Sequence, residues 1–291
     1  MIGIIGGTGL GEALFGEAAG TEHVIDMPFG RPSGPIRIVK WHGLEVALLA
    51  RHGDGHLVHP SQVPYRANIY ALKSLGVTHV LASGAVGSLR DEIRPRDLVI
   101  PDQIIDKTYR RTPTFFDVGL AVHVEFAEPF CPDLRRLLLS VADQVHTTVH
   151  PRGTYVCMEG PAFSTQAESQ MHRSWGGDLI GMTAMPEAKL AREAEMSYAL
   201  VALVTDYDCW RPHEPGASKQ RLLEEILEHL KAATANAVTL LRAAVAALAE
   251  KPLGPSPAHS ALELAIWSDR AKISPEVARK YGPLLARYTG R

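Results

Sequence analysis

The sequence predicts an α/β protein, because short apolar segments alternate with longer amphipathic ones along most of its 291 residues. The clearest predicted strand, 197–204, is a continuous apolar segment that leads directly into Asp206 and Asp208. The clearest predicted helix runs from Ser218 to Glu250, where apolar residues recur at helical spacing. Glycine or polar residues follow several other predicted strands, at the sheet edge where α/β proteins bind ligands.

Composition is typical of an ordinary globular protein, with 46% hydrophobic and 21% charged residues. The formal net charge of −2 gives no basic surface for nucleic acid. We expect no membrane segment of about 18 apolar residues, and the first residues lack the basic start and cleavage site of a signal peptide. Three scattered cysteines, Cys131, Cys157 and Cys209, indicate a reducing cytoplasm and argue against disulfides or a zinc site.

In the N-terminal half, the apolar residues 2–5 predict a strand that ends in the glycine loop Gly6-Gly7-Thr8-Gly9. Such a loop offers backbone N–H groups and a hydroxyl to an anion, although a simple tight turn explains it equally well. The further predictions in this half are strands at 36–39, 45–49, 78–83 and 97–105, a helix at 62–75, a second glycine loop at 84–88, and a long irregular segment at 106–132.

The loop at 50–60 contains Arg51, His52, His56 and His59. Three histidines suggest a metal site, but Pro60 argues against a helix that presents them on one face, and no cysteine pair accompanies them. Arg51 and His52 are better explained as a phosphate clamp, because a guanidinium binds phosphate oxygens in a bidentate manner.

The C-terminal half continues the alternation up to a proline-rich tail. The predictions are helices at 132–145, 165–175 and 186–195, and strands at 153–158, 178–182 and 197–204. Thr165 and Glu168 form a capping-box pattern at the start of the second helix. We expect residues 1–250 to form one domain. The tail, 251–291, is expected to be a docked or intersubunit appendage with short helices at 261–267 and 275–287.

The predicted strand ends together describe an anion site beside an acid pair. Residues i and i+2 of an extended segment face the same way, so Asp206 and Asp208 are expected to point into one pocket. The alternative, in which they cap the next helix or lie in solvent, stays open at this level. Met182 and Thr183, at the end of another strand, add a hydroxyl to the anion site.

Motifs in the same order resemble those of the trimeric purine nucleoside phosphorylases, and most closely the 5′-methylthioadenosine phosphorylases. They are Gly6-Gly7-Thr8-Gly9, Arg51-His52-Gly53, Glu159-Gly160-Pro161, Met182-Thr183-x-x-Pro186-Glu187 and Thr205-Asp206-Tyr207-Asp208. The resemblance extends from Met1 to about Ala249. It implies a single domain with a central mixed β-sheet, partly barrel-like, flanked by helices. It also implies phosphorolysis of 5′-methylthioadenosine or a related 5′-modified adenosine, with inorganic phosphate as co-substrate and no cofactor or metal.

The resemblance also implies a role for each matching residue. Asp206 matches a general acid at purine N7, which requires a pKa raised by burial and by Asp208. Asp208 matches an acceptor for the 6-amino group. Phosphorylases of 6-oxopurines have Asn at the position of Asp206 and Glu at that of Ser164, so Asp206 and Ser164 favour 6-aminopurines. The remaining implied contacts are Thr8, Arg51, His52, the Ala85 backbone and Thr183 for phosphate, Phe163 and Met182 for base and ribose, His56, Pro60, Leu222 and Leu223 for the 5′ group, and His123 from a neighbouring subunit.

Two positions depart from the family pattern. Gly84 stands where a hydroxyl residue is common, so phosphate binding would be weaker or would use Ser83. Lys219 replaces an apolar residue of the 5′ pocket, which leaves a hydroxyl, halogen or anionic 5′ substituent open. The alternatives are therefore a purine nucleoside phosphorylase with another 5′ preference, a nucleoside hydrolase and a non-catalytic adenine nucleoside binder. A shared His123 would make the active unit a homotrimer or a dimer of trimers.

Overall fold

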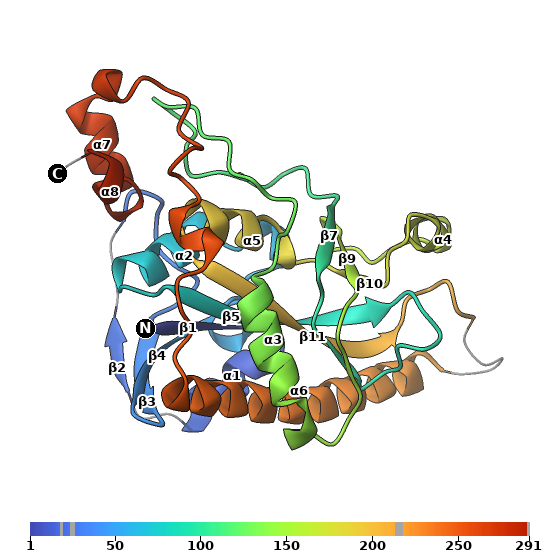
Figure 1. Cartoon of the computed structure of the whole chain (residues 1–291). Coiled ribbons are helices and arrows are strands. Elements are labelled where there is room, and N and C mark those ends of the chain that lie inside the picture. The colour runs from blue at the N-terminus through green and yellow to red at the C-terminus, as the bar shows by residue number, and fades with distance from the viewer. Residues whose placement is uncertain (18–19, 24–26, 213–217, 290–291) are drawn as a thin grey trace.

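The computed structural model describes residues 1–17, 20–23, 27–212 and 218–289. A mixed sheet of described strands runs through the molecule, with helices on both of its faces (Figure 1). The strands are β1 (Ile2–Gly6), β2 (Thr21–His23), β3 (Ile36–Trp41), β4 (Leu44–Ala50), β5 (His79–Ser88), β6 (Leu98–Val99), β7 (Gln103–Asp106), β8 (Val149–His150), β9 (Thr154–Cys157), β10 (Leu179–Gly181) and β11 (Ser197–Tyr207).

The described helices form two layers. Helices α1, α3 and α6 pack on one face, where α6 is the long helix at the bottom of Figure 1, and α2 and α5 pack on the other face. Their bounds are α1 (Leu10–Glu17), α2 (Tyr65–Ser74), α3 (Pro132–Ser140), α4 (Gln166–Ser174), α5 (Ala184–Glu193), α6 (Lys219–Glu250), α7 (Pro275–Tyr281) and α8 (Ala286–Thr289). This arrangement confirms the predicted α/β class with a central mixed sheet.

Strand β5 is the branch point of the sheet, which runs in the order β2-β3-β4-β1-β5-β10-β9-β7. It pairs in parallel with β1 on one side and with β11 on the other, and its end pairs antiparallel with β10. Strand β11 also pairs with β6, and β6 pairs with β8, so the sheet is branched and does not close into a barrel. Strand β4 is parallel to β1, so the C-terminal ends of β1, β4, β5 and β11 lie at one edge.

The prediction of a glycine loop at 84–88 is wrong, because strand β5 continues through these residues to Ser88. Each of them has a partner on β11, including Ala202 opposite Gly84. The glycines allow close packing: a Cβ on Gly87 would lie 3.0 Å from Ile180 Cγ2, and one on Gly84 would lie 3.3 Å from Thr183 Oγ1.

Other predicted ends shift where proline or a tighter turn intervenes. The single strand predicted at 97–105 is two strands, β6 and β7, separated by Pro101, which lacks a backbone N–H. The helix predicted at 62–75 begins only at Tyr65, after a 3₁₀ turn, Pro60–Gln62. The helix predicted at 132–145 ends at Ser140 and is followed by a 3₁₀ turn, Ala142–Gln144.

The capping box at Thr165 is confirmed: its hydroxyl accepts from the Glu168 backbone N–H, and the Glu168 carboxylate accepts from the Thr165 N–H. The irregular segment before α3 is also confirmed, apart from a single bridge between Val122 and Ile266. The elements around the other predicted motifs are present with small shifts of their ends.

The C-terminal tail lies against the α2 and α5 side of the molecule. Leu262, Tyr281 and Leu285 are buried in the same hydrophobic cluster as residues of α2 and α5. The helix predicted at 261–267 is absent; a 3₁₀ turn, Pro257–Ser260, precedes irregular backbone there. The helix predicted at 275–287 is replaced by α7, a 3₁₀ turn and α8.

Helix α6 corrects one expectation from the sequence. By length and composition alone, Lys219–Glu250 could cross a membrane, whereas no such segment was expected. In the fold, 44% of the most apolar 18-residue stretch of this helix is buried. Ala237, Leu241 and Ala244 pack within a hydrophobic cluster beside the sheet. The core helix of a globular protein meets the same criterion, and the packing of α6 is of that kind.

Candidate active site

A cavity of about 820 Å³ lies at the edge of the sheet where β1, β4, β5 and β11 end. It brings together most of the residues that the sequence predicted for a site. These are Thr8, Arg51, His52, His56, Pro60, Ala85, Phe163, Ser164, Met182, Thr183, Asp206, Asp208 and Leu222. The convergence places the predicted anion site and the predicted acid pair in one cavity.

Some predicted residues lie elsewhere. Leu223 is 56% exposed and does not line the cavity, although Leu227, one turn further along the same face of α6, does. The His123 ring packs on Trp267, with ring centroids 4.5 Å apart, outside the cavity of its own chain. Lys219, the first residue of α6, is exposed and also lies outside the lining. Ser83 is directed at the glycine loop, since its Oγ accepts from the Gly7 N–H at 3.1 Å.

The floor of the cavity is a gap in the sheet. The pairing of β1 with β5 ends at Ala82, and the pairing of β10 with β5 begins at Gly87. Between these two points, β5 has no strand partner on that side within the described chain. Ala85 lies beside this gap and lines the cavity, where the phosphate role requires it.

The glycine loop packs directly on Arg51. A Cβ on Gly7 would lie 2.6 Å from the Ser83 carbonyl oxygen and 2.8 Å from Arg51 Nη1, so only glycine fits there. The Arg51 backbone N–H donates to the Gly6 carbonyl at 2.9 Å. These contacts fix the loop that carries Thr8 relative to the guanidinium.

Arg51 forms a fully buried ion pair with Glu187 of α5. Its Nε and Nη2 donate to the two carboxylate oxygens, each at 2.7 Å, and its Nη1 donates to the Ser83 carbonyl at 2.6 Å. The Tyr198 hydroxyl also donates to Glu187, at 2.8 Å. Burial acts to lower the pKa of Arg51, but the Glu187 carboxylate outweighs it and holds that pKa above its ordinary value. A guanidinium has five N–H donors, so it retains donors for an anion after these contacts.

His52 acts as a neutral ring with a defined tautomer. Its Nδ1 lies 2.7 Å from the Val58 carbonyl oxygen, which only accepts, so Nδ1 carries the proton and Nε2 is an acceptor. Burial, and then the charge of Arg51, lower the pKa of His52 to about 4. In a phosphate clamp, His52 would therefore accept a hydrogen bond from a protonated phosphate oxygen and contribute no charge.

Asp206 and Asp208 lie side by side at the end of β11. The strand extends to Tyr207, further than predicted, with a register irregularity between Val204 and Asp206. Both carboxylates are next to Gly87: a Cβ there would lie 3.5 Å from Asp206 Oδ2 and 3.4 Å from Asp208 Cβ. The expectation that both face one pocket is confirmed, and the Thr205 hydroxyl lies 2.6 Å from Asp206 Oδ1.

Sequence reasoning missed Arg111, in the irregular segment before α3. Its Nη1 donates to the Met182 and Met185 carbonyls, both at 2.5 Å, and its Nη2 donates to the Glu159 carbonyl at 2.6 Å. Arg111 thereby joins the loop after β9, which carries Phe163, to the loop after β10, which carries Thr183. No local pattern marks this role, because its partners are distant in sequence.

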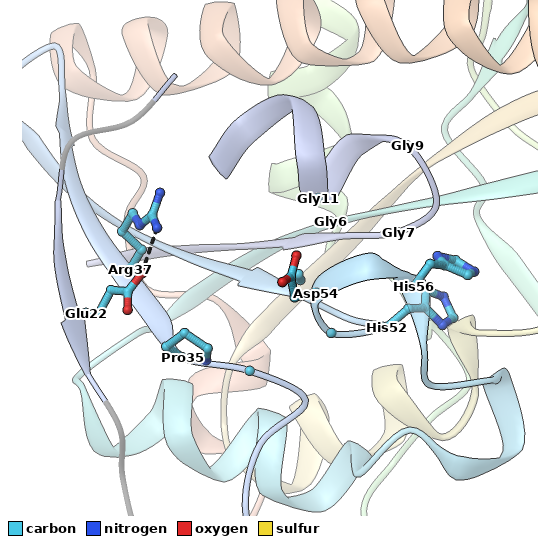
Figure 2. Close-up of a pocket in the computed structure, with 13 residues that line it drawn as sticks. Gly6, Gly7, Gly9, Gly11, Glu22, Pro35, Arg37, His52, Asp54 and His56 are labelled. Atoms are coloured by element: carbon cyan, nitrogen blue, oxygen red, sulfur yellow. Dashed lines mark hydrogen bonds and ion pairs between the residues drawn. The ribbon is translucent and has the colours of Figure 1, made fainter. Parts of the chain in front are cut away.

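A second cavity has a volume of about 530 Å³. Its lining includes the glycine loop, as Figure 2 shows. It shares His52 and His56 with the first cavity, and an ion pair between Arg37 and Glu22 lines its far side. The Glu22 carboxylate is paired with Arg37 at 2.6 Å, and Asp54 adds a further negative charge, whereas the larger cavity contains Arg51 and the Thr8 and Thr183 hydroxyls, so the larger cavity is the better phosphate site. Within the described chain, no three His, Cys, Asp or Glu side chains are grouped as metal ligands.

Comparisons with known proteins agree with this geometry. A family model described as the phosphorylase superfamily matches residues 1–246. The S-methyl-5′-thioadenosine phosphorylase of Gloeobacter violaceus is 47% identical over 99% of this chain and 95% of its own length. That of Geobacter sulfurreducens is 44% identical over 99% of both chains.

Solved structures are similar over the same extent. A methylthioadenosine phosphorylase from an antarctic soil metagenomic library superimposes with a TM-score of 0.89, at 44% identity over 98% of both chains. A mutant of the Schistosoma mansoni adenosine/methylthioadenosine phosphorylase, in complex with methylthioadenosine, has a TM-score of 0.77 at 36% identity, over 86% of this chain and 92% of that one. The chain therefore belongs to the phosphorylase superfamily and, within it, to the methylthioadenosine phosphorylases.

Proposed function

We propose that the protein is a pentosyltransferase that cleaves 5′-methylthioadenosine, or a related 5′-modified adenosine, with inorganic phosphate. The products are adenine and the 5-modified ribose 1-phosphate. The observation that carries this function is a single cavity that holds both an anion cradle and a carboxyl pair. The cradle suits the nucleophile, and the carboxyl pair suits the leaving base.

The phosphate half of the reaction uses the residues around the glycine loop. We assign phosphate contacts to the Thr8 and Thr183 hydroxyls, the Arg51 guanidinium, the Ala85 backbone and His52 Nε2. Monoprotonated phosphate has one O–H, which matches the acceptor on neutral His52. Held in this way, a phosphate oxygen attacks C1′ as the bond from C1′ to N9 breaks, and the anion stabilises the positive charge that develops on the sugar.

The base half uses the carboxyl pair. The electron pair of the broken bond passes to the purine, and a proton from Asp206 at N7 neutralises the charge that develops there. Asp208 accepts a hydrogen bond from the 6-amino group. Phe163 and Met182 would pack on the base and the ribose.

The 5′ end of the cavity favours an apolar substituent. Pro60, Leu222, Ile226 and Leu230 line the wall formed by the loop after β4 and by α6, together with His56. Lys219 lies outside that lining, and Arg221, which is part of it, is paired with Glu225 at 3.0 Å, so neither favours an anionic 5′ group. An apolar pocket discriminates only modestly against a hydroxyl, so adenosine is the expected second substrate.

We further propose a homotrimer, or a dimer of trimers, in the cytoplasm, with no cofactor besides phosphate. The exposed surface around His123 supports an oligomer, since Trp267 and Leu264 beside it are 73% and 89% exposed. Free cysteines at 131, 157 and 209 support a reducing compartment.

The test is adenine release from 5′-methylthioadenosine and adenosine, each with and without phosphate, with inosine as the 6-oxo control. Phosphate-dependent release from the first nucleoside, with little from inosine, is the expected result. Phosphate-independent release would indicate a hydrolase, and binding without release would indicate a nucleoside binder. Equal or better use of adenosine would assign a different 5′ preference.

A further inference from the structure

Helix α4, which follows the base-binding loop, buries polar side chains where most surface helices bury apolar ones. Its buried residues are Ser169 and His172, which are 0% and 1% exposed. They are three positions apart, so they lie on the same face of the helix. Burial of polar groups is unfavourable unless they are hydrogen-bonded, so this face needs polar partners.

Three buried polar atoms in this region have no hydrogen-bond partner within the described chain. They are Ser169 Oγ, His172 Nδ1 and Asp208 Oδ2. Helix α4 packs on the segment that follows Asp208: the Arg173 guanidinium lies 3.6 Å from the Trp210 ring centroid, and Cys209 Sγ donates to the Ser164 carbonyl at 3.2 Å. The charge of Asp208 also acts on the His172 ring. Since buried polar atoms are nearly always paired, the unpaired atoms of His172 and Asp208 at this contact indicate a shared partner.

The polarity of these atoms is complementary. His172 Nε2 lies 2.9 Å from Lys107 Nζ, and an ammonium only donates, so Nε2 is the acceptor. Burial, and then the charge of Lys107, lower the pKa of His172, so the ring is neutral and carries its proton on Nδ1. The interior therefore contains an N–H donor on His172, a carboxylate acceptor on Asp208, and a hydroxyl on Ser169 that can do either.

Asp208 lines the cavity, whereas its Oδ2 atom is buried and has no hydrogen-bond partner within the described chain. This oxygen is therefore available to a donor other than the base, and the adjacent helix α4 can supply that donor. A donor on the α4 side would fix the rotation of the carboxylate.

We propose that His172 is a positioning residue for base recognition, which acts on Asp208 through one bound water. His172 Nδ1–H donates to the water, the water donates to Asp208 Oδ2, and the Ser169 hydroxyl completes its coordination. The hydrogen-bonded chain from Lys107 through His172 to Asp208 keeps the Asp208 carboxylate oriented as an acceptor for a 6-amino group, so this inference rests on the proposed function.

The matched variants are His172→Asn and His172→Gln. The asparagine amide nitrogen can occupy the position of Nδ1 and keep the donor toward the water. The glutamine amide reaches the position of Nε2 and keeps only the contact with Lys107. His172→Phe keeps the ring and removes both nitrogens. Lys107→Met tests the outer end of the hydrogen-bonded chain from Lys107 to Asp208 without altering the buried face of α4.

The measurements are kcat and KM for 5′-methylthioadenosine, for inosine and for phosphate, with adenine affinity from calorimetry. His172→Phe is expected to lower kcat/KM for the adenine nucleoside about ten- to a hundredfold, the range for loss of a hydrogen bond to a charged group. The phosphate KM should not change, and the preference for adenine over 6-oxopurine nucleosides should fall. His172→Asn should recover to within about threefold of the unchanged protein, and His172→Gln should not. Lys107→Met should give a smaller loss in the same direction.

Unchanged kcat/KM in His172→Phe would overturn the inference, as would equal values for His172→Asn and His172→Gln. An equal loss for inosine and adenine nucleosides would also overturn it, because it would indicate general damage to the fold. Calorimetric binding of adenine tests the hydrogen-bonded chain from Lys107 to Asp208 without requiring turnover. Activity of the unchanged protein tests phosphorolysis itself, so failure of this inference and failure of the proposed function can be told apart.

Discussion

The buried ion pair between Arg51 and Glu187 provides the sharpest test of the site. Glu187→Gln keeps the size of the side chain and removes its charge. Arg51 is 0% exposed, so its guanidinium would remain charged in the interior without a counter-ion. In addition, the glutamine amide would place a donor against Arg51 Nε–H or Nη2–H, which now donate to carboxylate oxygens at 2.7 Å.

The expected loss of unfolding free energy is about 3 to 5 kcal/mol, the range for removing one partner of a buried pair. Tyr198→Phe removes one hydrogen bond to the same carboxylate, at 2.8 Å, and should cost about 1.5 to 3 kcal/mol. Glu22→Gln is the exposed control, because the side chains of Arg37 and Glu22 are 22% and 49% exposed; its cost should be about 0 to 1 kcal/mol.

The assay is urea denaturation at fixed protein concentration, followed by the phosphate and nucleoside KM of each variant. Loss of the guanidinium orientation should raise the phosphate KM about tenfold or more and leave the nucleoside KM within about threefold. A loss of stability for Glu187→Gln no larger than that for Glu22→Gln would refute the reasoning, because it would mean that the buried charge needs no partner.

Four further outcomes are expected. Asp206→Asn should lower turnover of adenine nucleosides about 10²- to 10⁴-fold, measured in steady state, because it removes the acid at N7. Gly7→Ala should raise the phosphate KM about tenfold or more, since the added Cβ would lie 2.6 Å from the Ser83 carbonyl. Burial raises the pKa of Glu193 to about 7 from its ordinary 4.5, so the stability provided by its bound proton is present at low pH and lost as the pH rises from about 4.5 to 7. The free energy of unfolding from urea titrations should therefore be about 3 kcal/mol lower at pH 8 than at pH 5, and Glu193→Gln should remove this difference. Lys219→Leu should leave the ratio of kcat/KM for 5′-methylthioadenosine and adenosine within about twofold, because this side chain lies outside the cavity.

For each of these four predictions, a specific result would contradict it. Turnover of Asp206→Asn equal to that of the unchanged protein would remove the acid assignment. Gly34→Ala is the control for the glycine loop, since a Cβ at Gly34 meets nothing within 4 Å, and equal phosphate KM values for the two alanine variants would contradict the packing argument. A pH dependence that persists in Glu193→Gln would assign it to other groups. A strong shift in 5′ preference for Lys219→Leu would place Lys219 at the pocket.

Much of the site could be predicted because its residues follow strands whose ends share one edge of the sheet. The apolar segment before Asp206 predicted a buried strand, and parallel pairing with β5 then places both carboxylates beside Gly87. The position of Leu223 could not be predicted in the same way. Leu222 lines the cavity and Leu223 does not, whereas Leu227, one turn further along α6, does, so the outcome depends on where the helix packs against the cavity.

The sequence alone determined the α/β class, the order of most elements and the residue types of the site, because periodicity and turn chemistry are local properties of the chain. The tertiary structure decided which glycines lie in a loop and which in a strand, since pairing with β11 holds Gly84 extended. It also decided that Arg51 is paired with Glu187, 136 positions away, and that Arg111 joins two loops of the site. These contacts depend on how distant segments pack together, and no local pattern of residues specifies that packing.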